Sequence, residues 1–407
     1  MKIGIVTTWF ERGAAYVSKQ YMQTFKNDGH DVKIYARGGE SYAKGNSSWD
    51  SEDVYWQDSN SFPIYNYVEM KEFKSWIDDN DFDFILFNEQ VWFEPIIYCK
   101  EIGLKTGAYI DYYTELMIPC FDIYDFVVCN TKKHLKAFKH HKNAIFIPWG
   151  TDVKLFDASE VRNSSDNVRF FHSCGMSPHR KGTDLLLKAY LNFSEQELIG
   201  TELIIHTQLD SNKLTFGLTK QEMSRYSMLL GKNIIVYDQT LTAPGAYHYG
   251  DIYVYPSRLD GLGLTVCEAI SCGMPIVVPD DGPMNEFVHS EYDEVVKVDK
   301  LFSRYDGYYW PQNEVCSIDL KDKMIKSKDS YKKTPAIHST IRKLAVDKFD
   351  WEKNSAELVD EIVKIKISTF DRDIADKCIK FNEKKFPHIY RFKSVYKIAF
   401  YLYKKLK

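Results

Sequence analysis

The sequence predicts an α/β protein with two domains, each built around a parallel β-sheet. The chain has 407 residues, more than one ordinary hydrophobic core contains. It opens with a buried strand, a loop, a helix and a second strand over residues 2–35. A strand, a glycine-bearing loop, a helix and another apolar strand follow one another over residues 252–278. Strands that alternate with helices are typical of parallel sheets with helices on their faces.

The first domain is predicted over residues 1–152. Its first strand, Lys2–Val6, is followed by a loop in which Gly13 is the only glycine. The G-x-G-x-x-G pattern of dinucleotide-binding domains is therefore absent, although the order of elements is that of a Rossmann-like domain. Residues 38–60 are polar and lack periodicity, so we expect a long loop there. The turn Pro148–Asp152 closes the domain.

The second domain is predicted over residues 168–370, after a polar interdomain linker at 153–167. It begins with the strand Arg169–Ser173, and a loop that carries Arg180 and Lys181 leads into its first helix. Two cations in a loop before a helix N-terminus suit a diphosphate, whose charge they neutralise. The alternative, a solvated Arg-Lys pair, stays open for Arg180 in particular.

Two later segments stand apart from this alternation. Residues 302–314 contain Tyr-Tyr-Trp-Pro and are predicted to form an aromatic loop. The C-terminal tail, residues 371–407, ends in a stretch from Phe386 that carries six Lys or Arg and no acidic residue. Its apolar side chains share one helical face. This pattern predicts either a helix lying in an anionic membrane interface or a C-terminal helix docked on the first domain.

The composition indicates a globular, cytoplasmic protein. Hydrophobic residues make up 44% and charged residues 27%, and the net charge of −4 argues against a general nucleic-acid binder. The eight cysteines are scattered without a C-x-x-C pair, as expected for reduced thiols. Met1 opens directly into a strand with no apolar leader, and no segment is apolar enough to span a bilayer. The basic tail leaves open a peripheral position on the inner face of a membrane.

The stretch from Asp260 to Val278 carries the clearest chemistry. Gly261 and Gly263 let the backbone approach a bound group, and the helix predicted from Thr265 points its N–H groups toward an anion such as phosphate. Glu268 lies one turn inside this helix, and seven residues separate it from Asp260. Two carboxylates beside a phosphate site suit hydroxyl-rich partners such as a ribose and a sugar ring. A capping Asp and a solvated Glu are the structural alternative for each residue alone.

The segment PSRLDGLGLTVCEAISCGMPIVV resembles the nucleotide-sugar site of the retaining glycosyltransferases of family 4. These enzymes have the GT-B fold, two Rossmann-like domains that face each other across a cleft, with a C-terminal helix that returns to the first domain. Their pattern is P-S-x-x-E-G-F-G-L-x-x-x-E-A-x-A-x-G-x-P-V-V. This chain departs from it at Asp260, which replaces Glu, and at Leu262, which replaces Phe. The shorter carboxylate bears on the identity of the sugar more than on the class of reaction.

The resemblance implies a role for each matching residue. Glu268 would hold the ribose hydroxyls, Asp260 the transferred sugar, and Lys181, with Arg180, the diphosphate. Backbone amides of Gly263 and Leu264 would bind the diphosphate oxygens. Relatives have an arginine where this chain has Met176. The predicted substrate-binding residues are Gly13, Arg180, Lys181, Asp260, Gly261, Leu262, Gly263, Leu264, Thr265 and Glu268.

The first domain would face the donor through two positions. Gly13 corresponds to the Gly-Gly turn of the relatives, which lies opposite the donor phosphates; a simple turn is the alternative. Many relatives have a histidine beyond the strand that here precedes Asp111. A carboxylate at that point would stabilise a developing oxocarbenium ion or bind an acceptor hydroxyl, and a turn-forming Asp fits equally. The predicted catalytic residues are Asp260, Glu268, Lys181 and Asp111.

The sequence therefore predicts a retaining glycosyltransferase that moves a sugar from a nucleotide-diphosphate donor, by family frequency a UDP-sugar, to a hydroxyl of a glycan or lipid-linked acceptor. No metal is expected to be required, and the D-x-D patterns within residues 79–83 are discounted as turn residues. Two alternatives stay open: another GT-B enzyme, such as a phosphorylase or hydrolase, and a sugar-nucleotide-binding protein that has lost catalysis.

Overall fold

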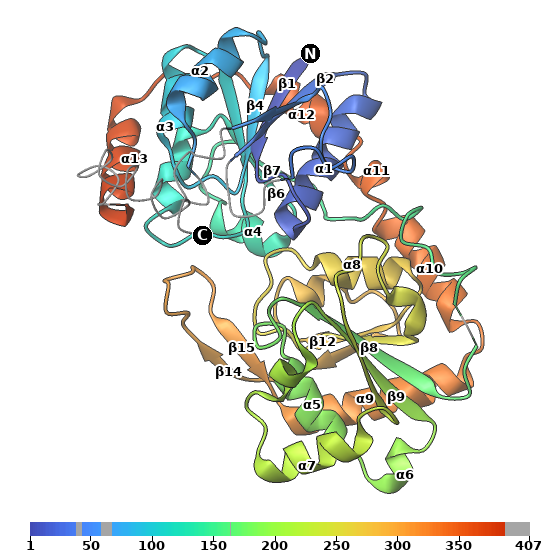
Figure 1. Ribbon diagram of the computed structural model, residues 1–407. Coiled ribbons are helices and arrows are strands. Elements are labelled where there is room, and N and C mark those ends of the chain that lie inside the picture. Colours follow the sequence, from blue (N-terminus) through green and yellow to red (C-terminus); the bar gives the residue numbers. More distant parts are fainter. Residues whose placement is uncertain (38–42, 58–66, 163, 387–407) are drawn as a thin grey trace. The chain divides into compact units, whose positions relative to one another are not determined.

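The chain forms two compact units in the computed structural model, which describes residues 1–37, 43–57, 67–162 and 164–386 (Figure 1). Unit 1 contains residues 1–130, 134–147 and the chain from Ser355 onward, and unit 2 contains Thr131–Lys133 and Pro148–Asn354. The chain thus leaves unit 2 at residue 354, whereas the sequence placed the end of the second domain at residue 370. The stretch predicted as an interdomain linker belongs to unit 2.

Unit 1 is built on a seven-stranded parallel sheet in the order β3-β2-β1-β4-β5-β6-β7. Its strands are β1 (Lys2–Thr7), β2 (Asp31–Ala36), β3 (Val54–Trp56), β4 (Phe84–Asn88), β5 (Lys105–Tyr109), β6 (Phe126–Cys129) and β7 (Ala144–Phe146). The prediction of loop throughout residues 38–60 is wrong at β3. This strand of β-branched and aromatic residues pairs with the edge of β2, and its polar surroundings concealed it.

The helices of unit 1 cover this sheet. They are α1 (Gly13–Asn27), α2 (Met70–Asp78), α3 (Glu94–Glu101), η1 (Ile118–Ile123), α12 (Leu358–Lys364) and α13 (Arg372–Lys385), with α4 (Lys132–Ala137) beginning among the residues of unit 2. The C-terminal return to the first domain is confirmed. Asn382 of α13 accepts the N–H of Phe93 at 2.8 Å and donates to the carbonyl of Val91 at 2.7 Å.

Unit 2 contains a six-stranded parallel sheet in the order β10-β9-β8-β11-β12-β13. Its strands are β8 (Val168–Gly175), β9 (Thr201–Thr207), β10 (Ile234–Asp238), β11 (Ile252–Val254), β12 (Ile276–Pro279) and β13 (Glu294–Val296). A separate antiparallel pair, β14 (Val298–Phe302) and β15 (Gln312–Val315), flanks the segment predicted as an aromatic loop. The predicted loop therefore forms the end of a β-hairpin. Its first residue, 302, belongs to β14, and its last residues, 312–314, belong to β15.

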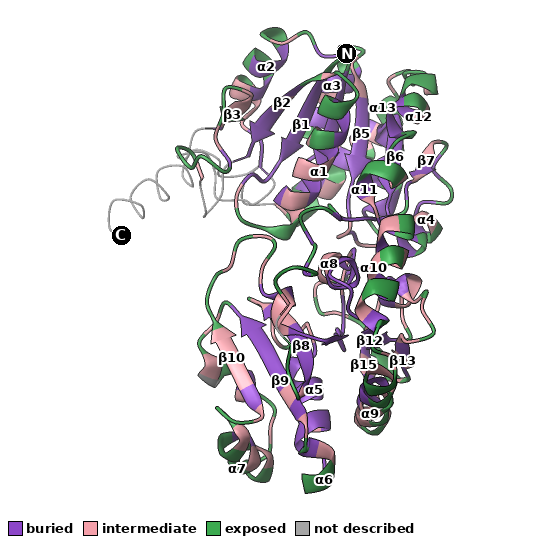
Figure 2. Ribbon diagram, turned by 90° about the vertical axis from the view of Figure 1, so that its right-hand side faces the viewer, coloured by how far each residue is buried: buried purple, intermediate pink, exposed green. Residues whose placement is uncertain are grey.

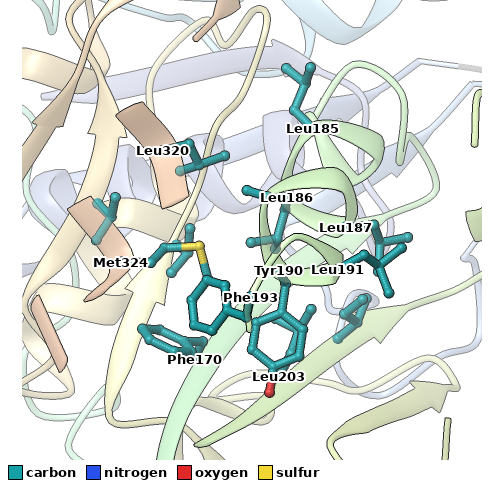
Figure 3. Packing of buried hydrophobic residues seen from close by; sticks show 14 of the residues in the cluster. Phe170, Leu185, Leu186, Leu187, Tyr190, Leu191, Phe193, Leu203, Leu320 and Met324 are labelled. Carbon is teal, nitrogen blue, oxygen red and sulfur yellow. The ribbon is translucent and has the colours of Figure 1, made fainter. Parts of the chain in front are cut away.

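Helices pack on the sheet of unit 2 and create its core. They are α5 (Thr183–Leu191), α6 (Glu195–Leu198), η2 (Ser211–Thr215), α7 (Lys220–Leu229), η3 (Tyr247–Tyr249), α8 (Leu264–Ser271), η4 (Met284–Phe287), α9 (Ser317–Lys333), α10 (Ile337–Lys348) and α11 (Trp351–Asn354). Figure 3 shows Tyr190 of α5 and Met324 of α9 packed with Phe170 and Leu203 of the sheet. The strands are mostly buried, whereas α7 presents exposed residues to solvent (Figure 2).

Both parallel sheets reverse their strand order at one point, between β1 and β4 in unit 1 and between β8 and β11 in unit 2. Ligands of open α/β sheets bind beyond the carboxyl ends of the strands at such a switch point. The loops that follow β8 and β11 carry Lys181 and Asp260, so the topology brings the two predicted site segments together.

No helix within the described residues is long and apolar enough to cross a membrane. The basic stretch predicted to contact a membrane, from Phe386 onward, lies outside the described residues except for Phe386 itself. Phe386 packs its ring against Trp92 in unit 1.

Candidate functional site

The loops after β8 and β11 pack against each other in unit 2. Gly182 has a φ of +73°, and a Cβ at this position would lie 1.9 Å from the carbonyl oxygen of Pro256. Only glycine fits this close approach. The contact continues at Arg258, whose N–H donates to the carbonyl of Arg180 at 2.9 Å, and at Ser257, whose hydroxyl donates to the same carbonyl at 3.3 Å. The two loops therefore form one structural element.

A buried ion pair holds this element in place. The guanidinium of Arg258 donates to both carboxylate oxygens of Asp184, at 2.6 and 2.8 Å. Both side chains are more than nine-tenths buried. Arg258 also donates to the carbonyl of His179 at 2.7 Å, which adds a third fixed point. Bidentate arginine–carboxylate pairs fix orientation as well as distance, so the loops are held in one geometry.

Asp260 lies at the centre of the two loops. Its Oδ2 accepts from the Lys181 ammonium at 2.5 Å and from the Tyr255 hydroxyl at 2.6 Å. Its Oδ1 accepts the N–H groups of Leu262 at 3.3 Å and Gly263 at 3.1 Å. Burial alone would raise the pKa of Asp260, but the charges of Lys181 and Arg180 hold it well below its usual range. The residue is therefore an anion that organises the loop.

Lys181 and Arg180 approach Asp260 from the loop after β8. Burial lowers the pKa of Lys181, and the neighbouring charge of Asp260 opposes this effect. The Lys181 ammonium donates to Asp260 and Tyr255, which leaves one of its three hydrogens for a further acceptor. Arg180 donates to the carbonyl of Leu259 at 2.8 Å and lies 3.5 Å from Asp260. Two cations thus border the anionic loop.

The helix α8 begins at this loop. Gly263 has a φ of +85°, and a Cβ there would lie 2.7 Å from the ring of Phe287, whereas Gly261 has no positive φ. The Gly263 N–H is already donated to Asp260. The N–H groups of Leu264 and Thr265 have no hydrogen-bond acceptor in the described part of the chain. The N–H groups open to an anion at this helix N-terminus are therefore those of Leu264 and Thr265, whereas the resemblance implies those of Gly263 and Leu264.

Glu268 lies on α8, one turn beyond these amides, and is partly buried. Burial raises the pKa of its carboxyl to about 7, although a hydrogen bond from the hydroxyl of Tyr247 and the charge of Lys181 oppose the rise. Glu268 and Lys181 influence each other electrostatically, which places them in the same site. The carboxyl accepts hydrogen bonds and changes its charge near neutral pH.

Sequence reasoning missed Tyr255 and Tyr247, which hold the two carboxylates. Tyr255 directly follows β11 at the end of an apolar run, and the sequence gives it the appearance of an ordinary buried residue. Tyr247 lies in a short 3₁₀ helix that no periodicity marks. No sequence signal separates these two from the other tyrosines, which number 28 in all.

The remaining predicted site residues, Gly13 and Asp111, lie in unit 1. Gly13 is exposed and is the first residue of α1. Asp111 follows β5, and its N–H donates to Oε1 of Glu89 at 2.9 Å. Glu89 has a φ of +55°, and burial followed by the nearby charge of Asp111 raises its pKa well above the usual range. Asp111 therefore belongs to a carboxyl pair. The missed signal is that Glu89 directly follows the apolar strand β4.

Comparisons with known proteins agree with this architecture. Residues 156–301 match the family described as Glycosyl transferases group 1. HepE from Anabaena, in complex with UDP and glucose, is similar with a TM-score of 0.65 and 16% identity, over 89% of this chain and 99% of HepE. The pneumococcal O-GlcNAc transferase GtfA, in complex with UDP and GlcNAc, has a TM-score of 0.64 and 11% identity over the same shares. The chain has the GT-B fold.

Relatives by sequence match this GT-B chain only in part. The lipopolysaccharide core biosynthesis mannosyltransferase LpsB of Rhizobium meliloti is 27% identical over 168 residues, which are 39% of this chain and 47% of LpsB. A probable sucrose-phosphate synthase of Thermosipho melanesiensis is 22% identical over 241 residues, which are 57% of this chain and 50% of the synthase. The chain thus spans about half the length of the curated relatives it matches.

Proposed function

We propose that this GT-B protein is a retaining glycosyltransferase of the family 4 type, which transfers a sugar from a UDP-sugar to a hydroxyl of a glycan or lipid-linked acceptor. The observation that carries the proposal is the cluster of Lys181, Asp260 and Glu268 at the switch point of unit 2, beside the open N-terminus of α8. Cations, helix amides and carboxylates are the groups that a nucleotide sugar requires together.

Each group has a defined part in binding the donor. The Leu264 and Thr265 amides and the remaining Lys181 hydrogen bind diphosphate oxygens, with Arg180 adding charge. Glu268 accepts hydrogen bonds from the ribose hydroxyls. Asp260 faces the transferred sugar, and because Lys181 and Tyr255 already hold its Oδ2, its orientation toward the sugar is fixed before binding.

The transfer breaks the bond between the anomeric carbon and the diphosphate oxygen and forms a bond from the same face to the acceptor oxygen. The acceptor proton passes to the departing diphosphate, whose growing negative charge Lys181 and the α8 amides stabilise. Retention follows because attack and departure share one face. This route needs neither a separate protein base nor a metal ion.

The choice of UDP rests on the relatives. HepE and GtfA are both structurally similar proteins in complexes that contain UDP. LpsB is a mannosyltransferase of lipopolysaccharide core biosynthesis, which supports a surface glycan as the acceptor class. Because Asp260 has a shorter side chain than the usual glutamate, we expect it to determine which sugar is bound. The donor panel must therefore vary the sugar and the base separately.

A thermal-shift panel of UDP-, GDP- and ADP-sugars tests the proposal with wild type, Glu268→Ala and Asp260→Ala. We expect UDP-sugars to raise the melting temperature of wild type, and Glu268→Ala to lose this stabilisation for every nucleotide. Asp260→Ala should keep nucleotide binding and lose the preference among sugars on one nucleotide. Glu291→Ala, at an exposed carboxylate of unit 2, is the matched control. If both site variants behave as this control does, the site assignment is wrong.

Product analysis separates this reaction from the alternatives. The anomeric configuration of the product, read by NMR, should equal that of the donor sugar. Sugar release in the absence of any acceptor would indicate a hydrolase, and a sugar phosphate formed from inorganic phosphate would indicate a phosphorylase. Binding of donors without turnover on any acceptor would indicate an inactive sugar-nucleotide-binding protein.

A further inference from the structure

A β-hairpin extends from unit 2 beside the candidate site. We call residues 298–315, which comprise β14, β15 and the segment between them, the aromatic hairpin. Its strands pair from Val298 with Val315 to Phe302 with Gln312, and Figure 1 shows it projecting from the sheet of unit 2. The match to the glycosyltransferase family ends at residue 301, so most of the hairpin lies beyond the matched segment.

The base of the hairpin is fixed to the residues that position the donor loop. The N–H of Asn313 donates to the carbonyl of Arg258 at 2.9 Å, and the Asn313 amide donates to Asp281 at 3.1 Å. Glu314 lies 3.6 Å from the Arg258 guanidinium. Arg258 is the residue that braces the loop containing Asp260. The hairpin is therefore held in a defined position relative to the donor site within unit 2.

The aromatic end of the hairpin returns toward the same site. The ring of Trp310 lies 5.3 Å from the ammonium of Lys133, a residue that belongs to unit 2. Lys133 lies 3.5 Å from Asp281 and is close enough to Asp260 for that charge to affect its pKa, which burial lowers. Trp310 thus lies beside a lysine whose charge interacts with that of Asp260.

Several large apolar side chains of the hairpin face solvent. Tyr305 is 97% exposed and Leu301 is 60% exposed, while Phe302 and Tyr309 are about two-fifths exposed. Leu301 and Phe302 lie in the paired strand β14, whereas Tyr305 and Tyr309 lie in the segment between the two strands. An ion pair between Arg304 and Asp306, at 3.0 Å, flanks the Tyr305 ring.

The charge of the hairpin limits the kind of partner that it fits. The hairpin carries two cations and three anions, so its net charge is −1: Lys300, Arg304, Asp299, Asp306 and Glu314. A surface for nucleic acid or for anionic lipid requires a cationic excess. Aromatic rings among charged groups of both signs, without a cationic excess, instead suit a sugar, whose C–H face packs on a ring while its hydroxyls bond to the charges.

We propose that the aromatic hairpin binds sugar units of the acceptor glycan, with Tyr305 as the stacking ring. This inference rests on the proposed transferase function and specifies its acceptor as a carbohydrate chain with at least one sugar beyond the reacting one. The hairpin is a binding element and takes no part in the bond-forming step.

An oligosaccharide array tests the inference with the full-length protein. The fluorescently labelled chain is applied, with UDP present, to immobilised glucans, mannans, galactans and N-acetylglucosamine oligomers. We expect wild type to bind at least one of these classes. Tyr305→Ala should bind the same class about three- to tenfold more weakly, in line with a single aromatic contact. Tyr305→Phe should bind as wild type does, because the ring is retained. Ile318→Ala, an exposed apolar residue of α9, is the control.

Other measurements keep this result separate from the donor site. UDP affinity, measured by calorimetry, should be equal in wild type and Tyr305→Ala. If wild type does not bind UDP, this result would contradict the transferase proposal and not the inference about the hairpin. Equal glycan binding by wild type and Tyr305→Ala would overturn the inference. So would a wild type that binds none of the oligosaccharides, or a dimer in sedimentation that depends on Tyr305.

Discussion

The ionisation of Glu268 offers a quantitative test of the candidate site. Its carboxyl has a pKa of about 7 in the folded protein against an ordinary value of 4.5, and burial is the main cause. At about 1.4 kcal/mol for each pKa unit, the difference corresponds to about 3 kcal/mol. Because the folded pKa is the higher one, the protonated carboxyl favours folding. This stabilisation is complete below pH 4.5 and is lost as the pH rises from 4.5 through 7.

Glu268→Gln removes the titration and keeps a neutral side chain of the same size that still accepts from Tyr247. Wild type should therefore lose up to about 3 kcal/mol of stability relative to Glu268→Gln between pH 4.5 and 8. At about 2–4 °C for each kcal/mol in a domain of this size, the melting temperatures should diverge by several degrees. Differential scanning calorimetry at pH 5, 6, 7 and 8 measures this divergence, with Glu291→Gln as the exposed control.

Nucleotide binding should change in the opposite direction. The ionised carboxylate is the better acceptor for ribose hydroxyls, so UDP affinity of wild type should rise as the pH passes 7, and Glu268→Gln should bind UDP more weakly without that rise. A variant that is more stable at pH 8 yet binds less nucleotide is expected only where burial of the carboxyl serves a ligand. Parallel melting curves of wild type and Glu268→Gln from pH 5 to pH 8 would refute the reasoning.

Three further outcomes are expected. Gly182→Ala should lower the free energy of unfolding by about 3 kcal/mol or more in chemical denaturation, because the new Cβ meets the Pro256 carbonyl and the backbone is left-handed. Gly231 has a φ of +77° and open space around it, so Gly231→Ala should lower this free energy by only about 1 kcal/mol. Equal losses in the two variants would contradict the loop contact. Lys100→Met should lower the free energy of unfolding by about 3–5 kcal/mol, because it leaves the buried carboxylate of Asp125, 2.6 Å away, without its cation. It should also make residues 355–386 sensitive to limited proteolysis, because Asp125 accepts the N–H of Ser368. An unchanged digestion pattern would show that this pair does not hold the C-terminal segment on unit 1. Treatment with EDTA should leave transfer of sugar unchanged, and activity that disappears and returns with Mg²⁺ would show that the reaction depends on a metal.

The sequence predicted the parts of this fold that depend on local pattern. Apolar runs and glycines located β8 and the start of α8 to within two residues, because buried parallel strands and the loops after them leave strong signals. The sequence did not predict the strands β14, β15 and β3, because they are short and lie among polar residues. Their pairing depends on neighbours distant in the chain, which a local window does not contain.

The candidate site divides in the same way. Lys181, Asp260 and Glu268 were found because their types and spacing match a chemical task. Tyr255, Tyr247 and Glu89 were not, because each acts through a contact made only after folding. Glu89 illustrates the limit. Its carboxyl meets the N–H of Asp111 through the pairing of β4 with β5, and nothing within the segment around Glu89 specifies that encounter.

The substitution of Asp for Glu at position 260 now has a structural explanation. The short side chain of Asp260 keeps one oxygen on the N–H groups of Leu262 and Gly263, so this carboxylate closes its own loop. The other oxygen then meets Lys181 and the Tyr255 hydroxyl. A glutamate, longer by one methylene, would extend past these amides. The aspartate side chain is shorter than a glutamate, but its contacts fix its position in the loop. Tyr255 is the side chain that connects this carboxylate to the sheet. If the protein has the proposed function, its sugar selection should consequently depend on Tyr255 as well as on Asp260.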